Sequence, residues 1–235
     1  MVNPAAQGFN QEASDAKAIN LADEVMEAMG GRPNWDQTQY VYWSFFGRRT
    51  LLWDKFGQRV RIESLPDSTI YLVDLKNKSG KVKRGSETIE QPDSLAKYVK
   101  KGESIWINDA YWLVMPFKLK DTGVTLKYAG QDTTQMGKIA EVLELTFDSV
   151  GDTPENKYRV YVDPESKLVI QWDFYRNAGD EKPGFSTPWG EYQKYGNIML
   201  SGDRGERDLT DIAVYTKVAE TAFTSFDPVD VSAPQ

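Results

Sequence analysis

Residues 157–175 contain two runs of β-branched and aromatic residues joined by Asp163-Pro164-Glu165-Ser166. Asp-Pro is typical of the start of a turn, and side chains alternate between the two faces of a strand. One predicted strand therefore places Tyr158, Val160 and Val162 on one face, and the next does the same with Leu168, Ile170, Trp172 and Phe174. Because most of the chain repeats this pattern, it predicts a meandering antiparallel β-protein.

Alternation and turn residues predict strands in eleven places, and two helical patterns interrupt them. The strands are expected at 38–46, 49–54, 58–63, 69–75, 81–85, 124–128, 138–147, 158–163, 168–175, 192–200 and 208–215, with a polar loop at 176–189. A helix is expected over 14–29, capped by Ser14 or Asp15. An insert near 92–115 is expected to hold one helix from Pro92 to about Gly102, and a short second helix ended by Pro116.

These elements predict a mainly β fold: a highly curved antiparallel sheet or half-open β-barrel, with the N-terminal helix and the insert covering its concave side. No change of composition divides the 235 residues. We therefore expect a single domain over 14–215, with 1–13 and 216–235 as flexible or peripheral ends.

The chain carries 28 basic and 35 acidic residues, a net charge of −7. This balance argues against binding to nucleic acid or to an anionic membrane surface. No apolar segment is long enough to span a bilayer. Residues 1–4 show no charged stretch followed by an apolar one, so we expect no signal peptide within this chain.

The sequence contains no cysteine and no histidine. This excludes disulfides, thiol catalysis, Cys/His zinc sites and Ser-His catalysis. It also contains no glycine-rich nucleotide-binding motif, and we expect no cofactor. Ser186 in Gly184-Phe185-Ser186-Thr187-Pro188 loosely resembles a nucleophile elbow, but the second glycine and a histidine base are missing.

Acidic residues on or beside the predicted strands offer a second kind of chemistry. Two carboxylates at a suitable separation could hydrolyse a glycosidic bond. The more ordinary interpretation is that these residues are solvated on outer faces. The six are Asp54, Glu63, Glu141, Glu144, Asp163 and Asp173.

The cluster Asp203, Glu206 and Asp208 could offer oxygen ligands to calcium. Its spacing matches no calcium-loop template, however, and Arg204 and Arg207 lie among the acids. We expect a charged turn and no metal.

Several segments together resemble a known pattern. They are Leu52-Trp53-Asp54-Lys55 with 59–63, Trp106-Ile107-Asn108-Asp109 with 111–119, 161–164 with Trp172, and 187–190. Over residues 18–215 the chain resembles an uncharacterised family of bacterial envelope proteins, common in Bacteroidetes-type bacteria. In outline that family is similar to the lipoprotein-carrier (LolA/LolB-like) superfamily.

This resemblance implies a half-open antiparallel barrel that binds an acyl chain or another hydrophobic ligand in the periplasm or cell envelope, without catalysis. In the carriers an arginine ties the lid helices to the barrel, and the sequence assigns none to that role. The chain has 7 Trp, 12 Tyr and 10 Phe, which suit either a packed core or an apolar cavity. The expected wall or lid residues are Trp53, Trp106, Trp112, Leu113, Met115 and Phe117.

Two other functions stay open at this point. One is a carbohydrate-active enzyme that uses paired carboxylates. The other is an envelope scaffold or interaction module whose interior is filled by its own side chains. The sequence predicts no particular protein partner.

Overall fold

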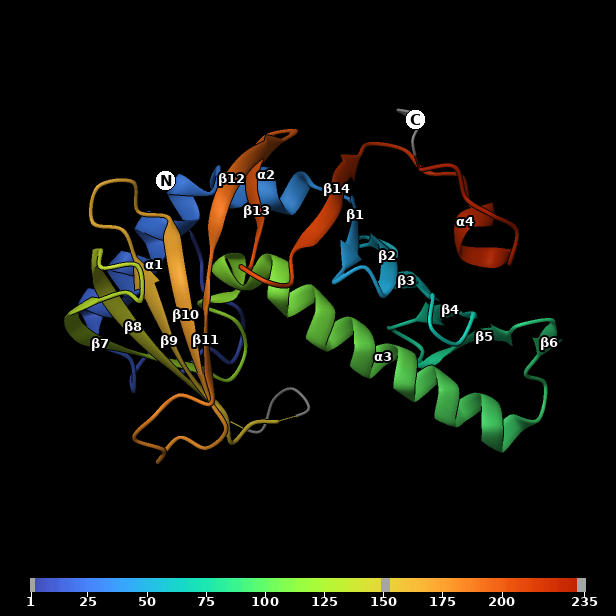
Figure 1. Cartoon of the computed structure of the whole chain (residues 1–235), viewed down its shortest axis with the longest axis horizontal. Coiled ribbons are helices and arrows are strands. Elements are labelled where there is room, and N and C mark those ends of the chain that lie inside the picture. Colours follow the sequence, from blue (N-terminus) through green and yellow to red (C-terminus); the bar gives the residue numbers. More distant parts are fainter. Residues whose placement is uncertain (1–2, 149–152, 232–235) are drawn as a thin grey trace. The chain divides into compact units, whose positions relative to one another are not determined.

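The computed structural model describes residues 3–148 and 153–231. It is mainly β, with curved antiparallel sheets and a few helices (Figure 1). The predicted fold class is thereby confirmed, and within the described residues no sheet closes on itself, as in a half-open barrel. The chain forms two compact units, a first unit of residues 1–35 and 113–206 and a second unit of 36–112 and 207–235. The single domain over 14–215, with its peripheral ends, stays a prediction.

The second unit contains an antiparallel sheet of seven strands in the order β14-β1-β2-β3-β4-β5-β6. Its strands are β1 (Tyr40–Phe45), β2 (Arg49–Asp54), β3 (Arg59–Ser64), β4 (Thr69–Asp74), β5 (Ser79–Arg84), β6 (Glu87–Thr88) and β14 (Leu209–Tyr215). Its helices are α3 (Pro92–Val114), whose last two residues belong to the first unit, and α4 (Thr221–Thr224). The predicted hairpins of β2 to β5 are confirmed, whereas β6 and α4 were not predicted.

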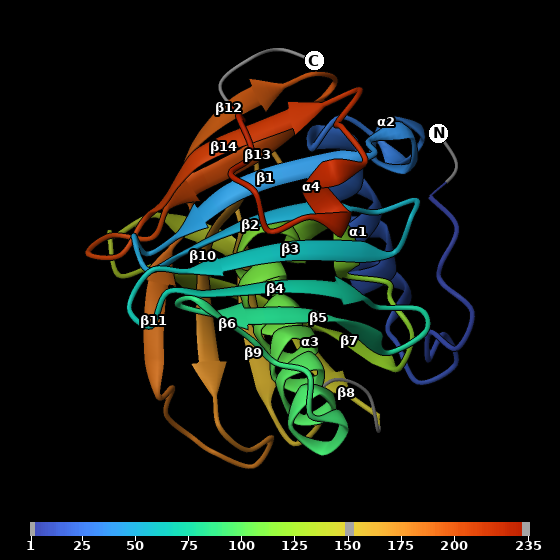
Figure 2. The same ribbon diagram turned by 90° about the vertical axis from the view of Figure 1, so that its right-hand side faces the viewer.

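The two faces of this sheet are covered by different elements. One row of cross-strand neighbours, Trp43, Leu51, Ile62, Tyr71 and Val82, is fully buried. Tyr71 contacts Tyr98 of α3, so this is the α3 face. Alternation sends their neighbours to the opposite face, where α4 lies (Figure 2). Both faces are therefore buried at least in part, which explains why β1 is apolar on both sides.

Helix α3 is continuous from Pro92 to Val114, so the predicted helix end at Gly102 is wrong. A Cβ atom at Gly102 would lie 2.8 Å from Cγ2 of Val73 and 3.3 Å from Cδ1 of Tyr71. This glycine therefore allows the helix to approach the sheet closely. The chain leaves α3 through a 3₁₀ turn, Met115–Lys118, because Pro116 cannot continue an α-helix.

The first unit contains a five-stranded antiparallel sheet in the order β11-β10-β9-β8-β7 and a separate hairpin, β12-β13. The strands are β7 (Val124–Thr133), β8 (Ile139–Phe147), β9 (Lys157–Val162), β10 (Val169–Tyr175), β11 (Phe185–Pro188), β12 (Gly190–Tyr195) and β13 (Ile198–Asp203). Its helices are α1 (Ala16–Ala28) and α2 (Arg32–Gln37), whose last two residues belong to the second unit. The predicted polar loop at 176–189 thus contains β11, and α2 begins just after Gly31 with Pro33 in its first turn.

Two predictions in this unit are wrong for local reasons. The strand expected at 192–200 is a hairpin that turns at Gly196, whose φ of +59° favours glycine. The register of β9 and β10 shifts between Val169 and Gln171, so Val169 pairs with Val162 while Trp172 pairs with Val160. Ile170 therefore leaves the predicted face and packs beside Tyr161 on the other side of the sheet.

The predicted first helix is confirmed, but its expected cap residues have another role. Asp15 precedes α1 without capping it. Its carboxylate accepts hydrogen bonds from the Tyr128 backbone N–H at 2.9 Å and from Lys127 Nζ at 3.1 Å. The hydroxyl of Ser14 accepts the backbone N–H of Leu126 at 3.0 Å. Both side chains therefore attach the start of α1 to β7.

Candidate functional site

Aromatic side chains hold α3 on the apolar face of the second unit's sheet. Trp106 of α3 contacts Trp53 of β2 with ring centroids 5.4 Å apart and planes at 64°. Six residues further along α3, Trp112 contacts Phe45 and Phe46 edge-to-face, with ring centroids 6.2 and 5.2 Å apart. The structure thus brings three of the predicted site residues to one helix–sheet interface.

An ion pair lies between these two aromatic contacts. Arg49 of β2 donates from Nε to Asp109 Oδ2 at 2.7 Å and from Nη2 to Oδ1 at 2.9 Å. The Asp109 side chain is fully buried, whereas 22% of the Arg49 side chain is exposed. Two parallel hydrogen bonds to one carboxylate form the strongest common type of side-chain ion pair. This pair therefore fixes the position of α3 on β2.

Burial raises the pKa of Asp109 above its ordinary value, and the hydrogen bonds from Arg49 and Asn108 offset part of this rise. The ionised form of Asp109 is thus stabilised by its partners but opposed by its surroundings. Its binding to Arg49 depends on a charge that the site itself disfavours.

Sequence reasoning missed this ion pair although two signals for it exist. Alternation along β2 places Arg49 on the same face as Leu51 and Trp53, where a cation is out of place. Asp109 lies in an otherwise mostly apolar stretch of α3, between Trp106 and Trp112. A charge in each of two apolar faces is the pattern that predicts a buried pair.

Three buried hydrogen-bonding groups on this interface have no partner within the described residues. They are Nε1 of Trp43, the hydroxyl of Tyr71 and Nε1 of Trp106. Each such group costs about 1–3 kcal/mol relative to a paired one. Native interiors hold few such groups, and water or a ligand can supply their missing partners.

The other three predicted site residues belong to the first unit. Leu113, Met115 and Phe117 are buried there. Phe117 stacks on Trp35 with centroids 4.3 Å apart, next to a cavity of about 10 Å³, room for a single water molecule. The six residues thus form two groups, and their assignment as wall or lid stays a prediction.

On the opposite face of the second unit's sheet lies the C-terminal strap, which we define as residues 216–231. Arg61 of β3 donates to three of its backbone carbonyls, those of Ala222 at 3.2 Å, Ser225 at 2.7 Å and Asp227 at 2.9 Å. Its Nε donates to Glu63 at 2.6 Å. Arg61 is buried, so this guanidinium is committed to holding the strap.

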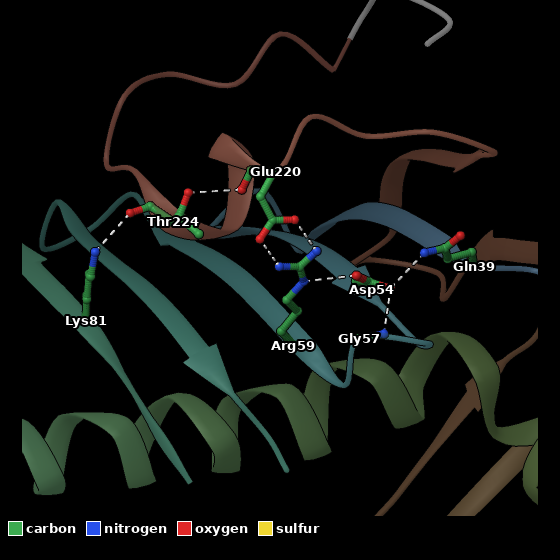
Figure 3. Close-up of polar contacts among 7 residues, drawn as sticks. All are labelled: Gln39, Asp54, Gly57, Arg59, Lys81, Glu220 and Thr224. Atoms are coloured by element: carbon green, nitrogen blue, oxygen red, sulfur yellow. Dashed lines mark hydrogen bonds and ion pairs between the residues drawn. The ribbon is translucent and has the colours of Figure 1, made fainter. Parts of the chain in front are cut away.

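A second arginine attaches the start of the strap (Figure 3). Arg59 donates to both carboxylate oxygens of Glu220 and, through Nε, to Asp54 at 2.9 Å. Asp54 also accepts the backbone N–H of Gly57 at 2.9 Å. The Arg59 hydrogen bond holds the pKa of Glu220 below its ordinary value. Four residues after Glu220, the Thr224 carbonyl accepts a hydrogen bond from Lys81 at 3.2 Å.

The strand carboxylates considered for catalysis are held by neighbouring groups. The expectation that they are solvated is wrong for Asp54 and Asp173, which are 1% and 4% exposed. Asp173 accepts the Tyr161 hydroxyl at 2.8 Å and the Gln171 amide at 2.9 Å. The remaining four contact cations or a turn: Glu63 with Arg61, Glu141 with Lys167, Glu144 with Arg159, and Asp163 with the backbone N–H of Ser166.

Other sequence candidates gain no support as sites. Ser186 lies on the edge strand β11 and not at a strand-to-helix elbow. Over residues 3–148 and 153–231 no three acidic side chains are grouped so that they could hold a metal ion. Within the same ranges no helix has the length and apolar character needed to cross a bilayer.

Comparisons with known proteins give distant structural likenesses and no family. No protein-family model matches the sequence, and no curated protein matches it. The chain is similar to a DUF1329 family protein from Desulfovibrio piger, with 13% identity and a TM-score of 0.47 over 88% of this chain and 96% of that one.

It is also similar to a putative outer membrane lipoprotein-sorting protein domain from Vibrio parahaemolyticus, with 10% identity, a TM-score of 0.41 and coverages of 88% and 96%. A third neighbour, MucB, has 16% identity and a TM-score of 0.28 over 82% of this chain and 68% of that one. The second neighbour is thus described as a lipoprotein-sorting domain, and the expected resemblance to the lipoprotein-carrier superfamily stays a resemblance. At these scores the likeness says nothing about ligand or activity.

Proposed function

We propose that this chain is a non-enzymatic protein of the cell envelope that binds a lipid or another apolar ligand beneath α3. In this proposal α3 is a lid on the second unit's sheet, and Trp53, Trp106 and Trp112 contact the ligand. Leu113, Met115 and Phe117 belong to the first unit, and their role as wall or lid is proposed there separately. The ligand is held by burial of its chain, and no bond is made or broken.

The observation that carries the proposal is how α3 is attached to the sheet. Beside the buried aliphatic side chains of Leu51, Ile62 and Val82, this interface carries aromatic edges, one ion pair and buried donors without acceptors in the described residues. The ion pair contains a fully buried carboxylate, and ion pairs of this kind contribute little net stability. The ion pair and the unpartnered donors are therefore the contacts of this interface that a ligand could most readily replace.

Binding an acyl chain can offset the cost of lifting α3. Each buried methylene group contributes about 0.8 kcal/mol. A chain of about a dozen methylenes thus brings a gross gain on the order of 10 kcal/mol before the costs of ordering and opening. Aromatic walls suit such a ligand because they are large, rigid and adaptable in their contacts.

The test is uptake of a fluorescent fatty acid by the wild type and by Trp112→Ala. We expect Trp112→Ala to weaken uptake while the melting temperature stays within a few degrees. Phe56→Ala is the matched control, because Phe56 is an aromatic residue in the β2–β3 turn that is 57% exposed. Uptake that is the same in all three proteins would count against α3 as the lid.

A second assay separates the enzyme alternative. Turnover of any member of a glycoside panel, with a bell-shaped dependence of rate on pH, would contradict the non-enzymatic proposal. Absence of both turnover and uptake would favour the scaffold.

A further inference from the structure

We propose that Arg49 is the receptor for the ligand's headgroup, that the headgroup is a carboxylate, and that Asp109 occupies this receptor while no ligand is bound. This inference rests on the proposed function and narrows it: the ligand is a long-chain fatty acid anion and not a neutral lipid. Asp109 is then an internal stand-in for the ligand's own carboxylate.

The geometry of the pair supports this assignment. The guanidinium of Arg49 presents two parallel N–H donors to one planar carboxylate, an arrangement that discriminates a two-oxygen anion from a hydroxyl or an ester. The Arg49 side chain keeps 22% of its surface exposed, whereas Asp109 has none. An incoming anion can therefore reach the arginine first and replace Asp109 from the solvent side.

The surroundings of Arg49 suit an amphiphile. The ring of Phe45 lies beneath the guanidinium with its centroid 4.9 Å from Cζ. The cross-strand row that contains Arg49 runs from Phe45 to Ser64 and Thr69. The next row on the same face is the buried row described above, which consists of apolar residues and Tyr71. A headgroup at Arg49 would thus leave its chain against an apolar surface.

Few other charges compete for this position. The charged group that contacts Asp109 is Arg49, and its further partner is the neutral amide of Asn108 on α3. On the same side of the sheet Asp67 interacts with Lys101 of α3 and Arg84 of β5. These three charges sum to +1, so no anion among them lacks a cation, and Arg49 with Asp109 is the one-to-one pair that a ligand anion would divide.

Exchange of the partners has a defined proton balance. The ligand carboxylate takes over the two N–H bonds of Arg49, and Asp109 loses the partner that stabilises its charge. Since burial disfavours that charge, Asp109 takes up one proton from solvent as the ligand binds. Binding of the anion should therefore strengthen as pH falls from neutral, until the ligand itself is protonated.

The experiment compares three probes of equal chain length, dodecanoate, dodecanol and dodecyl phosphate, as competitors of a fluorescent fatty acid. In the wild type we expect dodecanoate to bind more than about tenfold tighter than dodecanol, as for a lost hydrogen bond to a charged group. Arg49→Met should reduce that ratio to about one without abolishing dodecanol binding. Asp109→Asn should strengthen dodecanoate binding and remove its pH dependence.

The outcomes separate the two proposals. Dodecanol binding tests the apolar site alone, so its absence in the wild type would overturn the proposed function. Dodecanol binding with no preference for dodecanoate, or a preference that survives in Arg49→Met, would overturn only the role of Arg49. A dodecyl phosphate affinity above that of dodecanoate would overturn the carboxylate assignment. Arg49→Lys keeps the positive charge but loses the two parallel donors. Its preference for dodecanoate over dodecanol should lie between the preferences of wild type and Arg49→Met.

Discussion

Arg49 and Asp109 share two hydrogen bonds, yet only Arg49 retains contact with solvent. The pair is therefore asymmetric. Removal of the arginine leaves a buried carboxylate without its counter-charge, whereas removal of the carboxylate leaves an arginine that water can reach. This asymmetry allows stability measurements to test the site independently of any ligand.

We expect Arg49→Met to lower the free energy of unfolding by about 3–5 kcal/mol at pH 7 and Asp109→Asn to lower it by less. Urea unfolding followed by tryptophan fluorescence measures both. The cost of Arg49→Met should shrink as pH falls, because Asp109 is then protonated and needs no counter-charge. Equal costs in the two variants at pH 7 would show that Asp109 is not sealed from solvent.

The raised pKa of Asp109 also predicts the sign of a pH effect in the wild type. Between the ordinary carboxyl pKa and the raised one, the folded protein holds more protons at Asp109 than the unfolded chain. The contribution of this residue to stability is therefore full at low pH and is lost as pH rises through the raised pKa. The difference in unfolding free energy between wild type and Asp109→Asn, measured as a function of pH, should show this slope.

The close approach of α3 to the sheet predicts the effect of a single methyl group. Gly102→Ala would place Cβ 2.8 Å from Val73 Cγ2. The clash should outweigh the better helix propensity of alanine and destabilise the protein by about 1–2 kcal/mol. Lys100→Ala, at an exposed position two residues earlier, is the control and should change stability by less than about 0.5 kcal/mol. A stabilised Gly102→Ala variant would mean that α3 lies further from β4.

The C-terminal strap should depend on Arg61 more than on the ion pair at its start. Arg61→Met removes hydrogen bonds to three carbonyls and should cost at least about 2 kcal/mol, with faster amide hydrogen exchange over 221–227. Glu220→Gln, which breaks an exposed pair, should cost less than about 1 kcal/mol. If Glu220→Gln released the strap as fully as Arg61→Met, the carbonyl bonds would not be what holds it.

In the first unit, Tyr161 and Asp173 form a buried pair whose loss is measurable. Burial raises the pKa of Tyr161, and its hydroxyl stays protonated and donates to Asp173. Tyr161→Phe should therefore cost about 1.5–3 kcal/mol, as for a hydrogen bond to a charged acceptor. Tyr128→Phe is the comparison, because that hydroxyl lies 3.4 Å from Glu141 in a half-buried position and should cost much less. Thermal unfolding measures the loss of stability in both variants, and equal losses would contradict the prediction.

The antiparallel strands could be predicted from the sequence because their signals are local. Turn residues at Lys55–Gly57 and Asn77–Gly80 separate runs that alternate, and such runs pair with their neighbours. The strap could not be predicted in this way. It is held by Arg61 across more than 150 positions of sequence, and no periodicity in 216–231 indicates the partner.

Two glycines have roles that their positions in the sequence do not indicate. Gly102 indicated a helix end, but it serves the packing of α3 against Val73. Gly196 was placed inside a strand, but its positive φ turns the chain. The aromatic residues of the candidate site could be named from the sequence, whereas the Arg49–Asp109 pair depends on a helix meeting a strand 60 residues away.

The central claim is that the protein binds one fatty acid in an apolar site beneath α3. The most direct measurement is native mass spectrometry of protein purified without detergent, with organic extraction to identify bound lipid, before and after delipidation and reloading with a long-chain fatty acid. We expect close to one fatty acid per chain, lost on delipidation and regained on reloading. A mass equal to that of the bare chain in every sample would contradict it.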